Sequence, residues 1–203
     1  MNYNNMKNIF YTLVKKNRSH RRFDASQKIA ESELLELIDL ARLSPSARNK
    51  QNLKFIPLYT PEKLDKVFDC MTWAGYLTTW KGPAENERPS AYIIICWDKN
   101  ISPNRQSDFV DINTGIAAQT ILLGAAYIEL AGCYIGGFNA QKLSVILNLP
   151  EHLTPLAALA LGKSGETVVL EEMQDNDVRY WRDEEGKHHV PKRPIDEIVY
   201  RII

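Results

Sequence analysis

The segment 18–22 places three arginines and one serine within five residues: Arg18, Ser19, Arg21 and Arg22. Guanidinium groups hold phosphate through charge-assisted hydrogen bonds, each contributing about 1.5–3 kcal/mol. Two or three such contacts suffice to hold a phosphate monoester in water, since it carries a charge of about −1.5 to −2. The cluster therefore predicts a local anion-binding site. The alternative interpretation is a solvated basic turn.

A second polar segment, residues 44–52, follows one helix later. Its hydroxyl, amide and backbone groups are suited to the polar edge of a heterocycle. The candidate residues in this segment are Pro45, Ser46, Ala47, Asn49 and Gln51. Because the residue before a proline is disfavoured in a helix, Ser44-Pro45 also serves as a simple helix end, which is the alternative. We interpret the two polar segments as most of a binding site for one flat, anionic cofactor.

The paired glycines Gly136 and Gly137 allow the backbone to approach a ligand closely, or simply make a tight turn. The chain contains neither the G-x-x-x-x-G-K-[ST] nor the G-x-G-x-x-G phosphate motif. The four histidines lack helical ligand spacing, and neighbours on a strand point to opposite faces, so we predict no metal site.

Helices and strands must position these segments. Apolar residues recur with helical spacing over 6–14, and helices are also predicted over 32–43, from 61 to 68, from 108 or 111 to about 130, and over 140–147. Strands are predicted over 53–59, 91–97, 133–135 and 156–162. The long helix near 111–130 is rich in small residues, which let another helix approach closely. The length of the chain and its lack of a recognisable interdomain linker predict one domain over residues 1–203, with both helices and strands.

Residues 71–89 are rich in aromatic and turn residues, which indicates a lid or loop. Its aromatic side chains are Trp73, Tyr76 and Trp80, and we interpret them as a substrate pocket. Core packing is the alternative. Beyond this loop, residues 163–194 are charged with few apolar positions, whereas the tail 195–203 is apolar again. An apolar terminal segment after a polar one indicates that the tail packs against another apolar surface, such as that of a partner subunit.

Composition limits the function classes. Lys and Arg balance Asp and Glu at 25 each, so the chain has no global charge that favours nucleic acid. The longest mostly apolar stretch, 116–130, is too short and too polar to cross a membrane. The polar start 1–7 does not have the pattern of a signal peptide, and the three widely spaced cysteines suggest reduced thiols. We therefore expect a cytoplasmic protein.

In this order, the segments resemble the FMN-dependent nitroreductase family. The family pattern R-S-x-R-x-F is similar to residues 18–23, and P-S-A-x-N-x-Q is similar to residues 45–51. The helix pattern D-x-x-x-A-x-Q-x-L-x-L-x-A resembles 111–125 with slight shifts, the glycine turn resembles 135–138, and the basic closing motif resembles 191–198. The likeness covers nearly the whole chain.

The resemblance implies a homodimer of the α+β nitroreductase fold, with a central, mostly antiparallel sheet flanked by helices, and with FMN bound across the subunit interface. It implies that Arg18, Ser19, Lys192 and Arg193 hold the phosphate and ribityl chain. Arg21 is then expected near the pyrimidine end of the ring, where its charge would stabilise reduced flavin. Residues that the resemblance places along the flavin ring are Pro45, Ser46, Ala47, Asn49 and Gln51, from the other subunit, with Gly136 and Gly137 covering the face opposite the substrate.

The implied activity is transfer of electrons from NAD(P)H through flavin N5 to a small nitroaromatic or quinone acceptor, by a ping-pong mechanism in which no side chain acts as acid or base. Two alternatives stay open. One is a narrower reaction on the same fold, such as reductive dehalogenation, flavin fragmentation, or an oxidase or dehydrogenase step. The other is a flavin-binding protein without turnover, acting as a carrier or sensor.

Overall fold

The computed structural model describes residues 3–203, and residues 1 and 2 of the polar start lie outside it. Its centre is a five-stranded sheet in which every strand pair is antiparallel. The strands are β1 Phe23–Asp24, β2 Leu53–Leu58, β3 Ala91–Asp98, β4 Ala131–Ile135 and β5 Leu153–Ser164. Strand β5 pairs with β1, β3 and β4, and β3 also pairs with β2. The predicted strands are all present, and the last begins earlier than expected.

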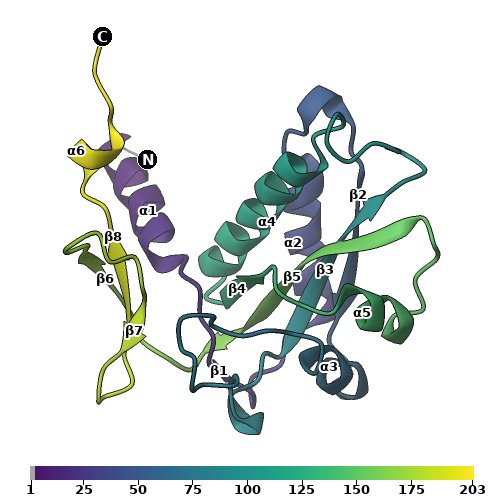
Figure 1. Cartoon of the computed structure of the whole chain (residues 1–203), viewed down its shortest axis with the longest axis horizontal. Coiled ribbons are helices and arrows are strands. Elements are labelled where there is room, and N and C mark those ends of the chain that lie inside the picture. The colour runs from purple at the N-terminus through teal and green to yellow at the C-terminus, as the bar shows by residue number, and fades with distance from the viewer. Residues whose placement is uncertain (1–2) are drawn as a thin grey trace.

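Helices cover both faces of this sheet (Figure 1). On one face lie α2 Glu31–Leu43 and α4 Val110–Tyr127, and on the other lie α3 Pro61–Phe68 and α5 Ala140–Ile146. The helices α1 Tyr3–Lys16 and α6 Ile195–Ile198 lie to one side of the sheet (Figure 1). Two 3-10 turns are also present, η1 Ala47–Asn49 and η2 Glu85–Glu87. Side chains of a strand alternate between faces, and β3 shows the result. Ile93 faces the core under α2 and α4, whereas its neighbour Ile94 faces the core that contains Val67 of α3 and Leu143 of α5.

The small residues of α4 let α2 pack close to it. A Cβ atom on Gly124 would lie 2.6 Å from Cδ1 of Leu40 and 3.0 Å from Cδ2 of Leu37, both on α2. The expected close helix approach is therefore made within one chain. It fixes the end of α2, and with it the start of the 44–52 segment.

The charged segment 163–194 forms a second, three-stranded sheet for which no strands were predicted. Its strands are β6 Val168–Glu172, β7 Trp181–Arg182 and β8 His188–Lys192, in the order β6-β8-β7. Polar cross-strand contacts replace the apolar alternation that would reveal such strands. His189 of β8 lies between Glu171, at 3.0 Å, and Asp183, at 3.1 Å, with its ring stacked on Trp181.

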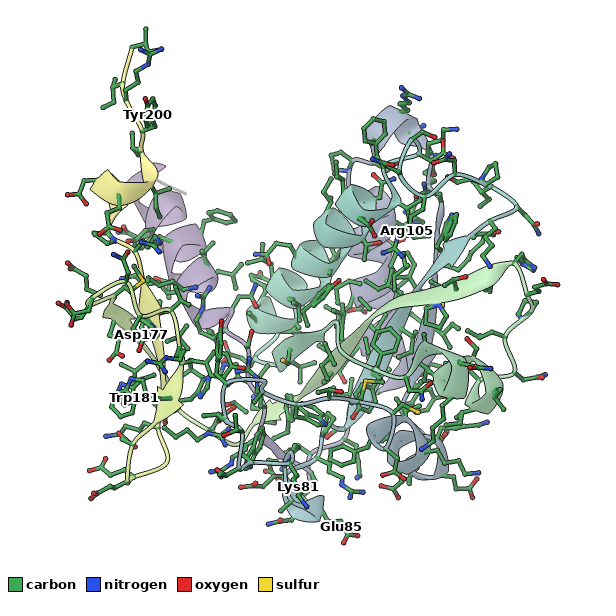
Figure 2. The ribbon with its side chains drawn as sticks, in the orientation of Figure 1. Lys81, Glu85, Arg105, Asp177, Trp181 and Tyr200 are labelled. Carbon is green, nitrogen blue, oxygen red and sulfur yellow. The ribbon has the colours of Figure 1, made fainter. Side chains whose placement is uncertain are left out.

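The C-terminal tail runs past α1 and away from the main sheet (Figure 1). Apolar side chains of this tail are exposed in the single chain, and Tyr200 near its end is 95% exposed (Figure 2). Among residues 3–203, no helix combines the length and apolar character needed to cross a membrane.

Candidate functional site

The arginine segment is a turn between α1 and β1 that is anchored at several points. Ser19 bridges to Gly132 at the start of β4, and the N–H of His20 donates to the Gly132 carbonyl at 3.0 Å. The Arg22 carbonyl accepts a hydrogen bond from the N–H of Gly165 at 2.9 Å. Strand β4 and the residue that follows β5 therefore hold the backbone of this turn.

A cavity of about 380 Å³ opens beside the turn. Three cationic side chains line it: Arg18, Arg21 and Lys192. The other lining residues are Asn17, Ser19, Gln119, Leu122, Gly132, Tyr134, Tyr180, His188 and Val190. None of the lining residues is acidic, so the cavity carries a local positive charge in a chain whose formal net charge is zero. Such a cavity suits a phosphorylated ligand.

Arg18 has spare hydrogen-bonding capacity at this cavity. One terminal nitrogen donates to the Val14 carbonyl at 2.9 Å, while its buried Nε has no hydrogen-bond partner among the described residues. Partial burial lowers the pKa of Arg18, yet a guanidinium stays charged at neutral pH. An anion beside Arg18 would complete the hydrogen bonding of this group.

Arg21 is held on several sides. Its Nη1 lies 3.0 Å from Nε2 of His188 and 3.4 Å from the Ser19 carbonyl, and its Cζ lies 4.5 Å from the ring centre of Tyr180. Burial, and then the charge of Arg21, lower the pKa of His188 to about 4. His188 is therefore neutral at physiological pH and accepts the hydrogen bond from Arg21.

The 44–52 segment forms a compact loop with its own hydrogen bonds. The N–H of Ala47 donates to Oδ1 of Asn113 at 2.7 Å, and the N–H of Gln51 donates to Oγ of Ser46 at 3.2 Å. Arg48, Asn49 and Gln51 all have left-handed backbones, with φ of 54°, 53° and 47°. Such conformations cost energy in residues other than glycine and cluster at ligand sites.

This loop borders a different cavity, of about 270 Å³, on another face of α4. Pro45, Ser46 and Gln51 line it together with mostly apolar side chains of α2, β2 and α4. Gln119 lines the cationic cavity and Asn113 the second one, and six residues along a helix turn the side chain by about 240°. One chain therefore does not bring its arginine turn and its 44–52 loop into one cavity. Ala47 and Asn49 line neither cavity.

Gly136 and Gly137 follow β4 and lie against the loop 71–89. The Gly137 carbonyl accepts a hydrogen bond from the N–H of Thr72 at 2.8 Å, and a Cβ on Gly137 would lie 3.3 Å from Cβ of Thr72. Both glycines are exposed, and neither lines the cationic cavity, which Tyr134 of the same strand does reach.

The three aromatic residues of the loop 71–89 have different surroundings. Trp73 is 7% exposed and packs against Phe68, so in this chain it takes the alternative role of core packing. The ring of Trp80 stacks against the guanidinium of Arg182, with 4.3 Å between the ring centre and Cζ of Arg182. Tyr76 does not line the cationic cavity, but its ring packs against Tyr180, which does, with 5.1 Å between the ring centres.

Lys192, the last residue of β8, and Arg193, which follows it, have different surroundings. Lys192 lines the cationic cavity. Arg193 instead donates to Glu197 at 2.9 Å and to Asn176 at 2.7 Å. Sequence reasoning did not identify Glu166, Tyr180 or His188, because all three lie in the segment 163–194, where no motif or periodic pattern marked them.

Comparisons with known proteins address the family and the fold of this chain. The sequence model described as Nitroreductase family matches residues 14–163. An NADPH-flavin oxidoreductase from Vibrio harveyi is 26% identical over 169 residues, which cover 77% of this chain and 66% of that protein, so the chain spans about two thirds of that relative.

Two solved structures have a similar fold. A nitroreductase family protein from Streptococcus pneumoniae TIGR4 superposes with a TM-score of 0.70 at 17% identity, over 95% of this chain and all of that one. An FMN-dependent nitroreductase from Clostridium difficile R20291 gives a TM-score of 0.61 at 24% identity, over 81% of this chain and 91% of that one. The predicted α+β nitroreductase fold is therefore confirmed. The family match covers most of the chain, from α1 to the end of β5, and the chain belongs to the nitroreductase family.

Proposed function

We propose that this protein is an FMN-dependent oxidoreductase that takes electrons from NAD(P)H and passes them to a small nitroaromatic or quinone acceptor. The observation that carries the proposal is the cationic cavity beside the arginine turn, with three cationic side chains and no acidic lining residue. Family membership and the flavin named for two of the similar proteins support it. When bound, FMN supplies the redox chemistry, with donor and acceptor using the same position in turn.

The chain's own residues bind and orient the cofactor. Arg18, Ser19 and Lys192 line the cavity and would hold the phosphate and ribityl chain, and the unpartnered Nε of Arg18 fits an anionic oxygen. Arg21 would lie beside the pyrimidine end of the ring, where its positive charge favours the negative charge that the ring gains on reduction. Tyr76 and Tyr180 would border the acceptor.

The second half of the site would come from another copy of this chain. Within one chain, the arginine turn and the 44–52 loop border different cavities. We infer a homodimer in which the loop of one subunit contacts the flavin held by the arginine turn of the other. The exposed apolar tail, including Tyr200, Ile202 and Ile203, would be covered by the partner subunit.

The visible spectrum of purified protein tests whether FMN is bound. NADPH and NADH are then added in turn under anaerobic conditions to test whether either nucleotide reduces it. Flavin bands that bleach with either nucleotide would support the proposal. Bound FMN that neither nucleotide reduces would favour a narrower reaction or a carrier. Protein that stays colourless after incubation with FMN would contradict the proposal.

Neighbouring basic residues provide a matched pair of variants for the phosphate site. Lys192→Ala should weaken FMN binding about ten-fold or more, the effect of losing one charge-assisted hydrogen bond. Arg193→Ala should leave FMN affinity within about two-fold, because Arg193 is engaged with Glu197 and Asn176. Equal losses in both variants would show that the cavity does not hold the phosphate.

A further inference from the structure

A buried carboxylate from the second half of the chain caps the arginine turn. The side chain of Glu166 is 1% exposed. Its Oε1 accepts hydrogen bonds from two consecutive backbone N–H groups, those of Arg21 and Arg22, the second at 3.1 Å. Its Oε2 accepts from Arg182 at 2.8 Å, and this ion pair compensates the buried charge. Glu166 therefore fixes the backbone from which the Arg21 side chain projects.

His188 then fixes the other end of Arg21. A guanidinium can only donate, so Nε2 of His188 must accept and Nδ1 must carry the proton. His188 is fully buried, and its Nδ1 has no hydrogen-bond partner among the described residues. A buried donor without a partner is costly, so an apolar side chain would suit this position better for packing alone.

The remaining donors of Arg21 are free to serve a ligand. Its contacts with His188 and Ser19 both use Nη1, and its charge lies against the face of Tyr180. Nε and Nη2 have no hydrogen-bond partner among the side chains that the structure describes, while Arg21 lines the cationic cavity. The contacts thus hold one edge of the guanidinium and leave the other edge to the cavity.

We propose that Glu166 and His188 are positioning residues that hold the Arg21 guanidinium toward the cofactor in the cationic cavity. This inference rests on the proposed function for its ligand, but the coupling between Arg21 and His188 is a property of the chain itself. Glu166 and His188 both lie beyond residue 163, where the match to the family model ends. The contacts that position Arg21 therefore come from a segment of this chain that the family model does not cover.

The test compares two substitutions of nearly equal length at one position. His188→Gln keeps an acceptor near the place of Nε2, whereas His188→Met removes it and leaves a flexible apolar side chain that tolerates a core environment. His188→Met should weaken FMN binding about ten-fold and lower the midpoint potential of bound FMN, because a mobile Arg21 stabilises reduced flavin less well. His188→Gln should stay within about three-fold of wild type.

A double-mutant cycle with Arg21→Ala separates positioning from general destabilisation. With Arg21 removed, His188→Met should change FMN affinity by less than about two-fold. A Met variant that equals the Gln variant, or that costs the same ten-fold without Arg21, would overturn the proposal. His189→Gln serves as the control, since that side chain faces Glu171 and Asp183 on the other side of β8, and it should leave FMN affinity unchanged.

Two further measurements keep the outcome decisive. If His188→Met does not melt cooperatively, Glu166→Gln takes its place in the same cycle, and a loss of FMN affinity that adds fully to that of Arg21→Ala overturns the proposal. If wild-type protein binds no FMN, the proposed function fails, and the Arg21–His188 coupling is measured by urea unfolding instead. A coupling of about five-fold or more in the unfolding equilibrium constant supports the positioning contact, and strict additivity rejects it.

Discussion

The side chain of Asn113, in the first turn of α4, accepts a hydrogen bond from the backbone N–H of Ala47 at 2.7 Å. Its Nδ2 donates to Oδ1 of Asn52 at 2.9 Å, and Asn52 in turn donates to Ser102 and to the Asp108 carbonyl. Asn113 and Asn52 are 3% and 0% exposed. One buried amide thus ties the 44–52 loop to the central helix.

Asn113→Ala should therefore lower the free energy of unfolding by about 2 kcal/mol, because it leaves a loop donor and a buried amide oxygen without partners. FMN affinity should fall as well, since the loop no longer keeps its left-handed residues in place. Urea unfolding and flavin titration measure the two effects. Asn86→Ala, at an exposed position, is the matched control and should change neither. Unchanged FMN affinity in Asn113→Ala would show that the loop does not contact the cofactor.

The main sheet and its helices were predictable because each element has a local signal. The β-branched run at 91–97 reads as a buried strand, and β3 is one. The small residues near Gly124 indicate close helix packing, and Leu37 and Leu40 provide it. The spacing of Arg18 and Arg21 indicated an anion site and left a solvated basic turn as the alternative, and the structure places both residues beside one cavity.

The second sheet was not predictable, because long-range polar contacts stabilise it. Glu166 reads as one charge in a charged segment, and only the fold shows that it caps the backbone of Arg21 and Arg22. The same holds for His188, whose neighbour His189 has an unrelated environment. The separation of Lys192 from Arg193 also depends on tertiary contacts that a basic motif does not specify.

His188 should make the protein sensitive to mild acid. Its folded pKa is lowered to about 4 by burial and by Arg21, whereas Glu166 opposes that shift. His188 therefore takes up a proton near pH 6.5 in the unfolded chain but only near pH 4 in the folded chain. Because the unfolded state binds more protons between these values, the free energy of unfolding falls as pH drops from about 6.5 to about 4. The full effect amounts to about 3 kcal/mol at most. Unfolding free energies of wild type and His188→Gln, measured across this range, should differ in slope, and parallel curves would refute the prediction.

His189 should have the opposite effect. Its hydrogen bonds to Asp183 and then Glu171 raise its pKa above the usual value. The contribution to stability is therefore fully present below about pH 6.5 and is lost as pH rises through the higher folded pKa. His189→Gln should remove this alkaline decline, and salt should weaken it in wild type because the network is partly exposed. Thermal melts from pH 6 to pH 9, at low and high salt, measure both effects.

Gly165 controls how closely the second half of the chain approaches the arginine turn. A Cβ atom there would lie 2.9 Å from the carbonyl carbon and 3.0 Å from the carbonyl oxygen of Phe23, which are backbone atoms that cannot rotate away. Gly165→Ala should therefore displace β1, lower the free energy of unfolding by about 1–3 kcal/mol and weaken FMN binding, because Arg21 and Arg22 directly precede Phe23.

Gly75→Ala is the matched control, because among residues 3–203 nothing lies within 4 Å of the position that its methyl group would take. Alanine also leaves the unfolded chain fewer conformations than glycine does, so the free energy of unfolding should stay unchanged or rise by about 0.4–1 kcal/mol. Equal stability of the two variants would mean that β1 shifts without cost and that the close approach at Gly165 does not hold the turn in place.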